Sequence, residues 1–187
     1  MAAKDDFIVV LDFMPHGKPT DRRAEPVAQG IGEKFFNLLE VAIKDETTIK
    51  TKDRLYIGEE KREQVKYIRG RISYRELTNY AKNMLEEVIT ELVNADEKRF
   101  VEFFNKASPL TTRVHTLELL PGIGKKHMWQ IVEEKKKKPF ESFKEIQERI
   151  AMLPDPKKII IKRILDELEE KDRYKLFVSG GLLPFSA

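Results

Sequence analysis

The sequence contains no cysteine in its 187 residues. This absence excludes disulfides, thiolate zinc sites, iron–sulfur ligation and a cysteine nucleophile. Histidine is also scarce, because only His16, His115 and His127 occur and they are scattered along the chain. No P-loop and no metal-ligand spacing appears either. We therefore expect neither a metal site nor a cofactor.

Long apolar runs are missing as well. The N-terminal segment MAAKDDFIVVLDF places charges directly before an apolar stretch of strand length. A signal peptide would begin with a basic segment, and a membrane helix would need a longer span. We expect a soluble, cytoplasmic protein without membrane contacts. Hydrophobic residues make up 41% of the chain, which is enough for one large domain or two small ones.

Charge of one sign is not in large excess over the whole chain, since 35 basic and 32 acidic residues give a net charge of +3. The excess is local. Residues 125–138, KKHMWQIVEEKKKK, carry six lysines and two glutamates, which leaves 29 basic and 30 acidic residues elsewhere. A basic patch of this kind attracts phosphates without making the whole protein a polycation.

The first part of the chain has the pattern of β-structure. FIVVLDF, EKFFNLLEVAIK, DRLYIG and EQVKYIRGRISY are short, rich in β-branched and aromatic residues, and bounded by Gly, Pro and Asp. Four or five such strands predict a small barrel over residues 1–76, OB-like in preference to SH3-like. The segment MPHGKPTDRRAEP between the first two strands is expected to be an exposed, mobile loop.

After Arg75 the apolar period changes to about 3.6 residues. It predicts connecting helices over 77–109, the second of them capped by Asp96, and a helical domain over 110–172 with a helix from Leu110. Asp155 before Pro156 favours the start of the last helix. Residues 173–187 alternate like a strand and are expected to form a strand or tail that returns to the barrel. The predicted fold class is therefore α+β.

The turn LPGIGKK at residues 120–126 is the main candidate site. Pro121 ends one helix, Gly122 and Gly124 permit close backbone approach, and a new helix begins at about Lys125. Its first amides and the positive end of its dipole can hold a phosphate oxygen, while Lys125 and Lys126 add charge. Ile123 is expected to point inward. We predict that nucleic-acid backbone is bound by Gly122, Ile123, Gly124, Lys125 and Lys126; the alternative is a simple connector.

The same tripeptide Gly-Ile-Gly occurs at residues 30–32, where it leads into a β-like run. No helix dipole is available there, so we expect a bulge or a barrel corner. Trp129, the single tryptophan, is expected to pack against another helix rather than to stack on a base.

A secondary nucleic-acid surface is predicted from basic and aromatic residues elsewhere. In a strand, Tyr67, Arg69 and Arg71 share one face, which suits base stacking and phosphate neutralisation. An ordinary solvent face explains the same pattern equally well. The candidates for this surface are Lys135, Lys136, Arg62, Lys66, Tyr67, Arg69 and Arg71.

The turn and its surroundings resemble the helix-hairpin-helix family, in which an apolar helix, Leu-Pro-Gly-Ile-Gly and a basic second helix follow one another. PFESFKEI is similar to the segment after many such hairpins. MLPDPKKIIIKRI, at 152–164, is similar to LLPGIGKKHMWQI with one residue missing and both glycines lost, which implies a second, structural copy.

Over nearly the whole chain, PVAQGIGEKFFNLLEV, RLYIG, RISYRELT, FVEFFNKASPLTTRVHTLELLPGIGKKHMWQI and PFESFKEI resemble an archaeal family of unknown function, domain of unknown function 655. The resemblance implies an OB-like N-terminal part, a helix-hairpin-helix C-terminal part and RNA or nucleic-acid binding.

The functional expectation is a non-catalytic protein that grips the sugar-phosphate backbone of RNA or DNA with little sequence dependence. The alternative is an adaptor that binds a protein of the transcription or ribosome machinery, suggested by the apolar tail GGLLPFSA. Catalysis is not expected, because the paired glutamates of the helices have the spacing of surface ion pairs with lysine rather than that of a nuclease site.

Overall fold

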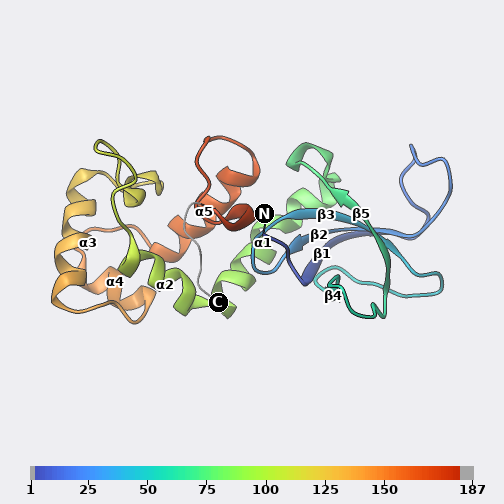
Figure 1. Cartoon of the computed structure of the whole chain (residues 1–187), viewed down its shortest axis with the longest axis horizontal. Coiled ribbons are helices and arrows are strands. Elements are labelled where there is room, and N and C mark those ends of the chain that lie inside the picture. The colour runs from blue at the N-terminus through green and yellow to red at the C-terminus, as the bar shows by residue number, and fades with distance from the viewer. Residues whose placement is uncertain (1–2, 182–187) are drawn as a thin grey trace. The chain divides into compact units, whose positions relative to one another are not determined.

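The computed structural model describes residues 3–181 and has an α+β fold (Figure 1). The chain divides into two compact units. In the described part, residues 3–88 and 167–181 form the β unit, and residues 89–166 form the helical unit. Within residues 3–181, no helix has both the length and the apolar character needed to cross a membrane.

The β unit is built on a five-stranded antiparallel sheet that curls into a half-barrel (Figure 1). The strand order is β4-β1-β2-β3-β5, so β4 and β5 form the two edges. The strands are β1 Phe7–Met14, β2 Val27–Gly32, β3 Leu38–Ile43, β4 Arg54–Tyr56 and β5 Val65–Arg71.

Two of the three inner strands, β2 and β3, are buried along their whole length. Since alternate side chains of a strand point to opposite faces, both faces of the sheet centre are covered. The apolar side chains of one cluster form the core of this unit: Ile8, Val10, Ala28, Leu39, Val41, Ile43, Ile49, Leu55, Ile57 and Val65. After β5 the chain passes through the 3₁₀ turn Tyr74–Glu76 into helix α1, Asn79–Ala95.

The first Gly-Ile-Gly lies inside β2, where Gly30 pairs with Val10 on one side and Leu39 on the other. The predicted bulge exists, but it lies on β1, where the register shifts between Val10 and Asp12. A Cβ at Gly30 would lie 3.0 Å from the Val9 carbonyl oxygen, so the close approach of β1 favours glycine there.

The prediction of a single strand over EKFFNLLEVAIK is wrong for the first part of that segment. β2 ends at Gly32, and a tight turn precedes β3. Phe36 has φ 56° in this turn, and the amide of Gly32 donates to the Asn37 carbonyl over 2.8 Å. The side chain of Asp5 stabilises the turn by accepting the amides of residues 34 and 35 over 2.9 and 2.8 Å.

The C-terminal segment returns to the β unit as a loop, not as a strand. One carboxylate oxygen of buried Glu167 accepts the amides of residues 176–178 over 2.8, 3.0 and 3.1 Å. The amide of Ser179 then donates to the Phe35 carbonyl over 2.8 Å. These last residues belong to a short 3₁₀ turn, Val178–Gly180. Residues 182–187 of the expected apolar tail lie outside the described residues.

The helical unit contains α2 Glu97–Lys106, α3 Lys125–Lys137, α4 Phe143–Arg149 and most of α5 Pro156–Leu168. The helix expected from Leu110 is not formed. Instead, residues 109–115 make a loop closed by a β-bridge between Pro109 and His115, and a 3₁₀ turn, Thr116–Leu119, follows. The Thr111 hydroxyl accepts the amides of residues 113 and 114, an alternative to helical bonding that threonine offers.

The two predicted helix caps differ in outcome. Asp155 accepts the Lys157 amide over 3.0 Å, which confirms it as a cap of α5. Asp96 occupies the N-cap position of α2, but its side chain makes no capping hydrogen bond. The apolar periodicity is confirmed in both helices, because Phe100, Phe104 and Ile160 are buried.

We expect Gly32→Ala to destabilise the protein by about 2 kcal/mol or more, because the added methyl group would overlap the Asp5 carboxylate and displace it from the turn amides. Urea unfolding followed by circular dichroism measures the loss. Gly124→Ala is the matched control. At that position φ is −94° and a Cβ meets nothing within 4 Å, so its change should stay under about 1 kcal/mol. Equal stability losses in both variants would contradict the prediction.

Candidate functional site

The turn at residues 120–124 joins the 3₁₀ turn of the helical unit to α3. Gly122 has φ +80°, a left-handed conformation that favours glycine. Ile123 is buried, as the sequence predicts, and its amide donates to the Leu120 carbonyl over 3.2 Å. A Cβ at Gly122 would lie 3.8 Å from Pro154 Cγ, so the turn before α5 lies against this one.

The beginning of α3 has no side-chain cap. Gly124 is the N-cap, and the first backbone bond of the helix runs from the Met128 amide to the Gly124 carbonyl over 3.0 Å. Within residues 3–181 the amides of residues 125–127 have no hydrogen-bond partner. By contrast, the Ser142 hydroxyl caps α4 by accepting the Glu145 amide.

The side-chain position of the N-cap residue is open, because a Cβ at Gly124 would meet nothing within 4 Å. Steric fit therefore does not require glycine at this position. A glycine at the N-cap leaves the amides available, whereas Ser, Thr, Asp or Asn would occupy them. Uncapped amides at the positive end of a helix dipole can bind an anion.

Two lysines flank these amides. Lys125 is 77% exposed, and its Nζ lies 3.8 Å from a carboxylate oxygen of Glu118. The same glutamate accepts the His115 amide over 2.8 Å, so it also belongs to the cap of the preceding 3₁₀ turn. Lys126 is exposed and forms no ion pair with another described residue. The turn therefore has an exposed cationic side with one nearby carboxylate.

The lysines at residues 135–137 form hydrogen bonds or ion pairs within the protein. Lys135 Nζ donates to the Ala107 carbonyl, and burial, together with the charge of Lys136, lowers the pKa of Lys135. Lys136 pairs with Glu133 at 3.5 Å, and a similar pair joins residues 137 and 134 at 2.6 Å. Of the two candidates from this run, Lys136 is exposed, whereas Lys135 is directed into the protein.

Trp129 does not pack as predicted, since its side chain is 59% exposed. The buried stripe of α3 consists of Met128 and Ile131. Trp129 follows Met128 by one position, a rotation of about 100° around the helix axis, and this rotation turns it away from the core.

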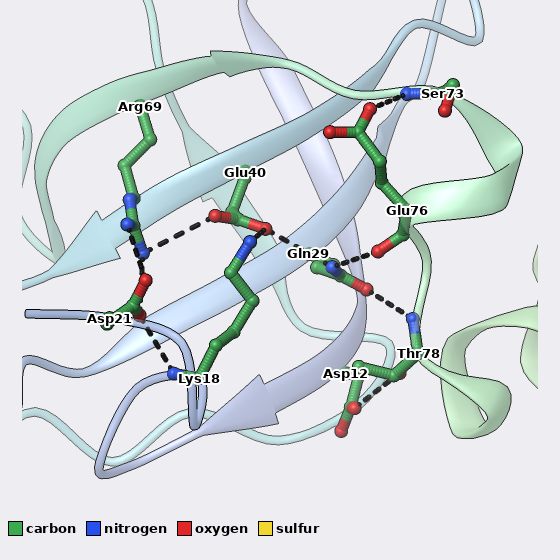
Figure 2. Close-up of polar contacts among 9 residues, drawn as sticks. All are labelled: Asp12, Lys18, Asp21, Gln29, Glu40, Arg69, Ser73, Glu76 and Thr78. Carbon is green, nitrogen blue, oxygen red and sulfur yellow. Dashed lines mark hydrogen bonds and ion pairs between the residues drawn. The ribbon is translucent and has the colours of Figure 1, made fainter.

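On the β unit, carboxylates of the β1–β2 loop, residues 15–26, contact two side chains of the predicted β5 surface. The two terminal nitrogens of Arg69 each donate a hydrogen bond to a carboxylate oxygen of Asp21, over 3.1 and 2.9 Å (Figure 2). Tyr67 donates to Glu25 over 2.5 Å, and this carboxylate raises the pKa of the phenol. The loop expected to be mobile is thus fastened to the sheet through the side chains predicted to bind nucleic acid.

A buried carboxylate, Glu40 on β3, lies at the centre of this network (Figure 2). Its oxygens lie 3.0 Å from Lys18 Nζ and 3.4 Å from an Arg69 nitrogen. Buried Gln29 donates to the same carboxylate over 3.2 Å and to the Glu76 carbonyl over 3.0 Å. The side-chain oxygen of Gln29 accepts a hydrogen bond from the Thr78 amide over 2.9 Å. Glu40 therefore connects the loop, the sheet and the segment that leads into α1.

The other candidates on this unit are dispersed. Arg62 donates to the Gly58 carbonyl over 2.9 Å, and Arg71 donates to the Ala3 carbonyl over 3.1 Å. Lys66 is exposed and forms no ion pair with another described residue. Tyr67 and Arg69 contact the same loop, but the structure does not gather the five residues into one site.

Comparison with known proteins places the chain in a family. The model of a family described as "Protein of unknown function (DUF655)" matches residues 4–179. The chain belongs to the DUF655 family. It is 48% identical over 176 residues to the uncharacterized protein MJ0038 of Methanocaldococcus jannaschii, covering 93% of this chain and 80% of that protein.

The crystal structure of the DUF655 protein Af1531 from Archaeoglobus fulgidus is similar, with a TM-score of 0.84 and 47% identity. The match covers 92% of this chain and 99% of that one. Both relatives are archaeal, as the sequence resemblance implies, and the similarity extends over both units of this DUF655 chain.

The stability that this DUF655 protein gains from the contact between Asp21 and Arg69 should depend on pH. Hydrogen bonds from Arg69, aided by the Lys18 amide, lower the pKa of Asp21 from 3.8 to about 2. A carboxylate with a lowered folded-state pKa stabilises the fold above its unfolded pKa and loses that effect as pH falls through the folded value. Asp21→Asn should therefore lower the urea midpoint relative to wild type at pH 5, and the difference should shrink between about pH 4 and 2.

The control is Asp45→Asn, which removes an exposed carboxylate that makes no ion pair with a described residue. It should change the midpoint little at pH 5. A gap between wild type and Asp21→Asn that stayed constant from pH 5 to pH 2 would show that the pair with Arg69 does not stabilise the fold.

Proposed function

We propose that this protein is a non-catalytic nucleic-acid-binding protein that grips the sugar-phosphate backbone of RNA or DNA through a helix-hairpin-helix at residues 120–126. The observation that carries the proposal is the beginning of α3, where uncapped amides lie beside an open N-cap position and two exposed lysines. The left-handed Gly122 and the buried Ile123 support the hairpin assignment.

Such a site would bind with little sequence preference. Backbone amides and lysine ammonium groups contact phosphate oxygens, which are the same at every nucleotide. The amides supply short hydrogen bonds, and the lysines add attraction that weakens as salt replaces the released counterions. The half-barrel is in this proposal an OB-like module with a subordinate role, because its Arg69 is already paired with Asp21 and Glu40.

A second candidate function is an adaptor that contacts a protein of the transcription or ribosome machinery. It is favoured by Met152, which is 92% exposed in the turn between α4 and α5 and has φ 60°. A large apolar side chain at the tip of a turn is a typical contact residue at protein interfaces.

Charge reversal tests the hairpin role. We expect Lys125→Glu with Lys126→Glu to weaken binding of a labelled RNA or DNA oligonucleotide at least about tenfold, and to reduce the slope of log affinity against log salt by about 1.5. Fluorescence anisotropy at several salt concentrations measures both quantities, with duplex and single-stranded ligands compared.

The matched control is Lys106→Glu with Lys144→Glu, an equal charge change at exposed positions of the same unit, each paired with a helix neighbour. It should lower affinity far less. If both double variants weakened binding equally, long-range charge rather than the hairpin would be responsible. A protein that co-purified with wild type, in the absence of nucleic-acid binding, would favour the adaptor.

A further inference from the structure

The outer face of α3 carries an exposed aromatic ring, Trp129. Trp129 is 59% exposed, although tryptophan is usually well buried, and neighbouring Met128 and Ile131 are in the core. Within the described residues, no aromatic ring or cationic group stacks on the indole. The rotation of α3 that buries Met128 and Ile131 therefore leaves the indole accessible to a partner.

The position of the indole relates it to the proposed phosphate grip. Trp129 follows Lys125 by four residues and Lys126 by three, so the three side chains share one face of the helix. Lys136 lies seven residues further along the same face. One helical turn rises about 5.4 Å. The indole therefore lies about one turn of α3 from a phosphate held at the first amides.

Stacking on a base suits this position. Every base presents a π-face, and an aromatic ring between cationic groups is the arrangement that binds single strands without reading sequence. In a duplex both faces of an inner base are covered by its neighbours, so an indole on a helix surface cannot reach them. The three lysines outnumber the two carboxylates beside them, Glu118 and Glu133, and the remaining positive charge favours an anionic partner over an apolar protein surface.

We propose that Trp129 is the stacking platform for an unpaired base and makes α3 selective for single-stranded RNA or DNA over duplex. The inference rests on the proposed backbone grip and deepens it by naming the ligand class. The grip alone holds phosphates of either form, whereas the indole distinguishes them.

The test uses the intrinsic fluorescence of the whole chain, since Trp129 is its only tryptophan. We expect 12-nucleotide single strands of RNA and of DNA to quench the emission saturably. Blunt duplexes with the same number of phosphates should quench it weakly. Trp129→Ala should lower single-strand affinity about tenfold and leave duplex affinity within about twofold, measured by anisotropy of a labelled ligand. Trp129→Phe should retain part of the binding.

The control variant is Tyr80→Ala, which removes a 52% exposed aromatic ring from α1 of the β unit and should leave both affinities unchanged. Equal losses for single strand and duplex in Trp129→Ala, or no loss at all while wild type binds, would overturn the stacking role alone. Absence of any nucleic-acid binding by wild type would overturn the backbone grip as well. Stronger quenching by the RNA strand than by the DNA strand would support the stacking role with RNA as the preferred ligand.

Discussion

The arrangement of the β unit depends on one constraint: a negative charge in the middle of a sheet costs free energy unless it is paired. Glu40 lies on a strand that is buried along its whole length, and a buried carboxylate is tolerated only when it is paired and hydrogen-bonded. Three side chains meet this need: Lys18, Arg69 and Gln29. They come from the β1–β2 loop, β5 and β2. A single charge thereby determines where the loop lies, holds an edge strand and, through Gln29, positions the segment before α1.

The helical unit shows the opposite arrangement, because the amides that begin α3 have no hydrogen-bond partner among residues 3–181. By comparison, a hydroxyl caps α4 and a carboxylate caps α5. The two Gly-Ile-Gly tripeptides differ in the same sense. The close approach of β1 favours glycine at position 30, whereas position 124 has room for a side chain. An identical short sequence thus serves dense packing in one unit and an accessible backbone in the other.

Much of the fold could be predicted from local sequence. The α+β class, most helices, the buried Ile123 and the Asp155 cap follow from apolar period, turn residues and capping chemistry, which act over a few positions. β2 was harder to predict, because VAQGIG has a glutamine and two glycines where strands usually carry large side chains. The fastened loop could not be predicted, since Asp21 and Arg69 are 48 positions apart and each resembles an ordinary surface charge. The exposure of Trp129 depends on the rotation of α3 about its axis, which a short helix with few apolar residues specifies weakly.

The Glu167 contact has a consequence for the order in which the protein can fold during synthesis. The β unit includes residues 167–181, so it is interrupted in the chain by the whole helical unit. Residues 176–178 reach the Glu167 carboxylate, and Ser179 reaches the Phe35 carbonyl, only after residues 89–166 have been made. Domains generally fold from the N-terminus as they leave the ribosome. Here the unit that emerges first is the last to be completed, and the contiguous helical unit can form while the half-barrel still lacks its final segment.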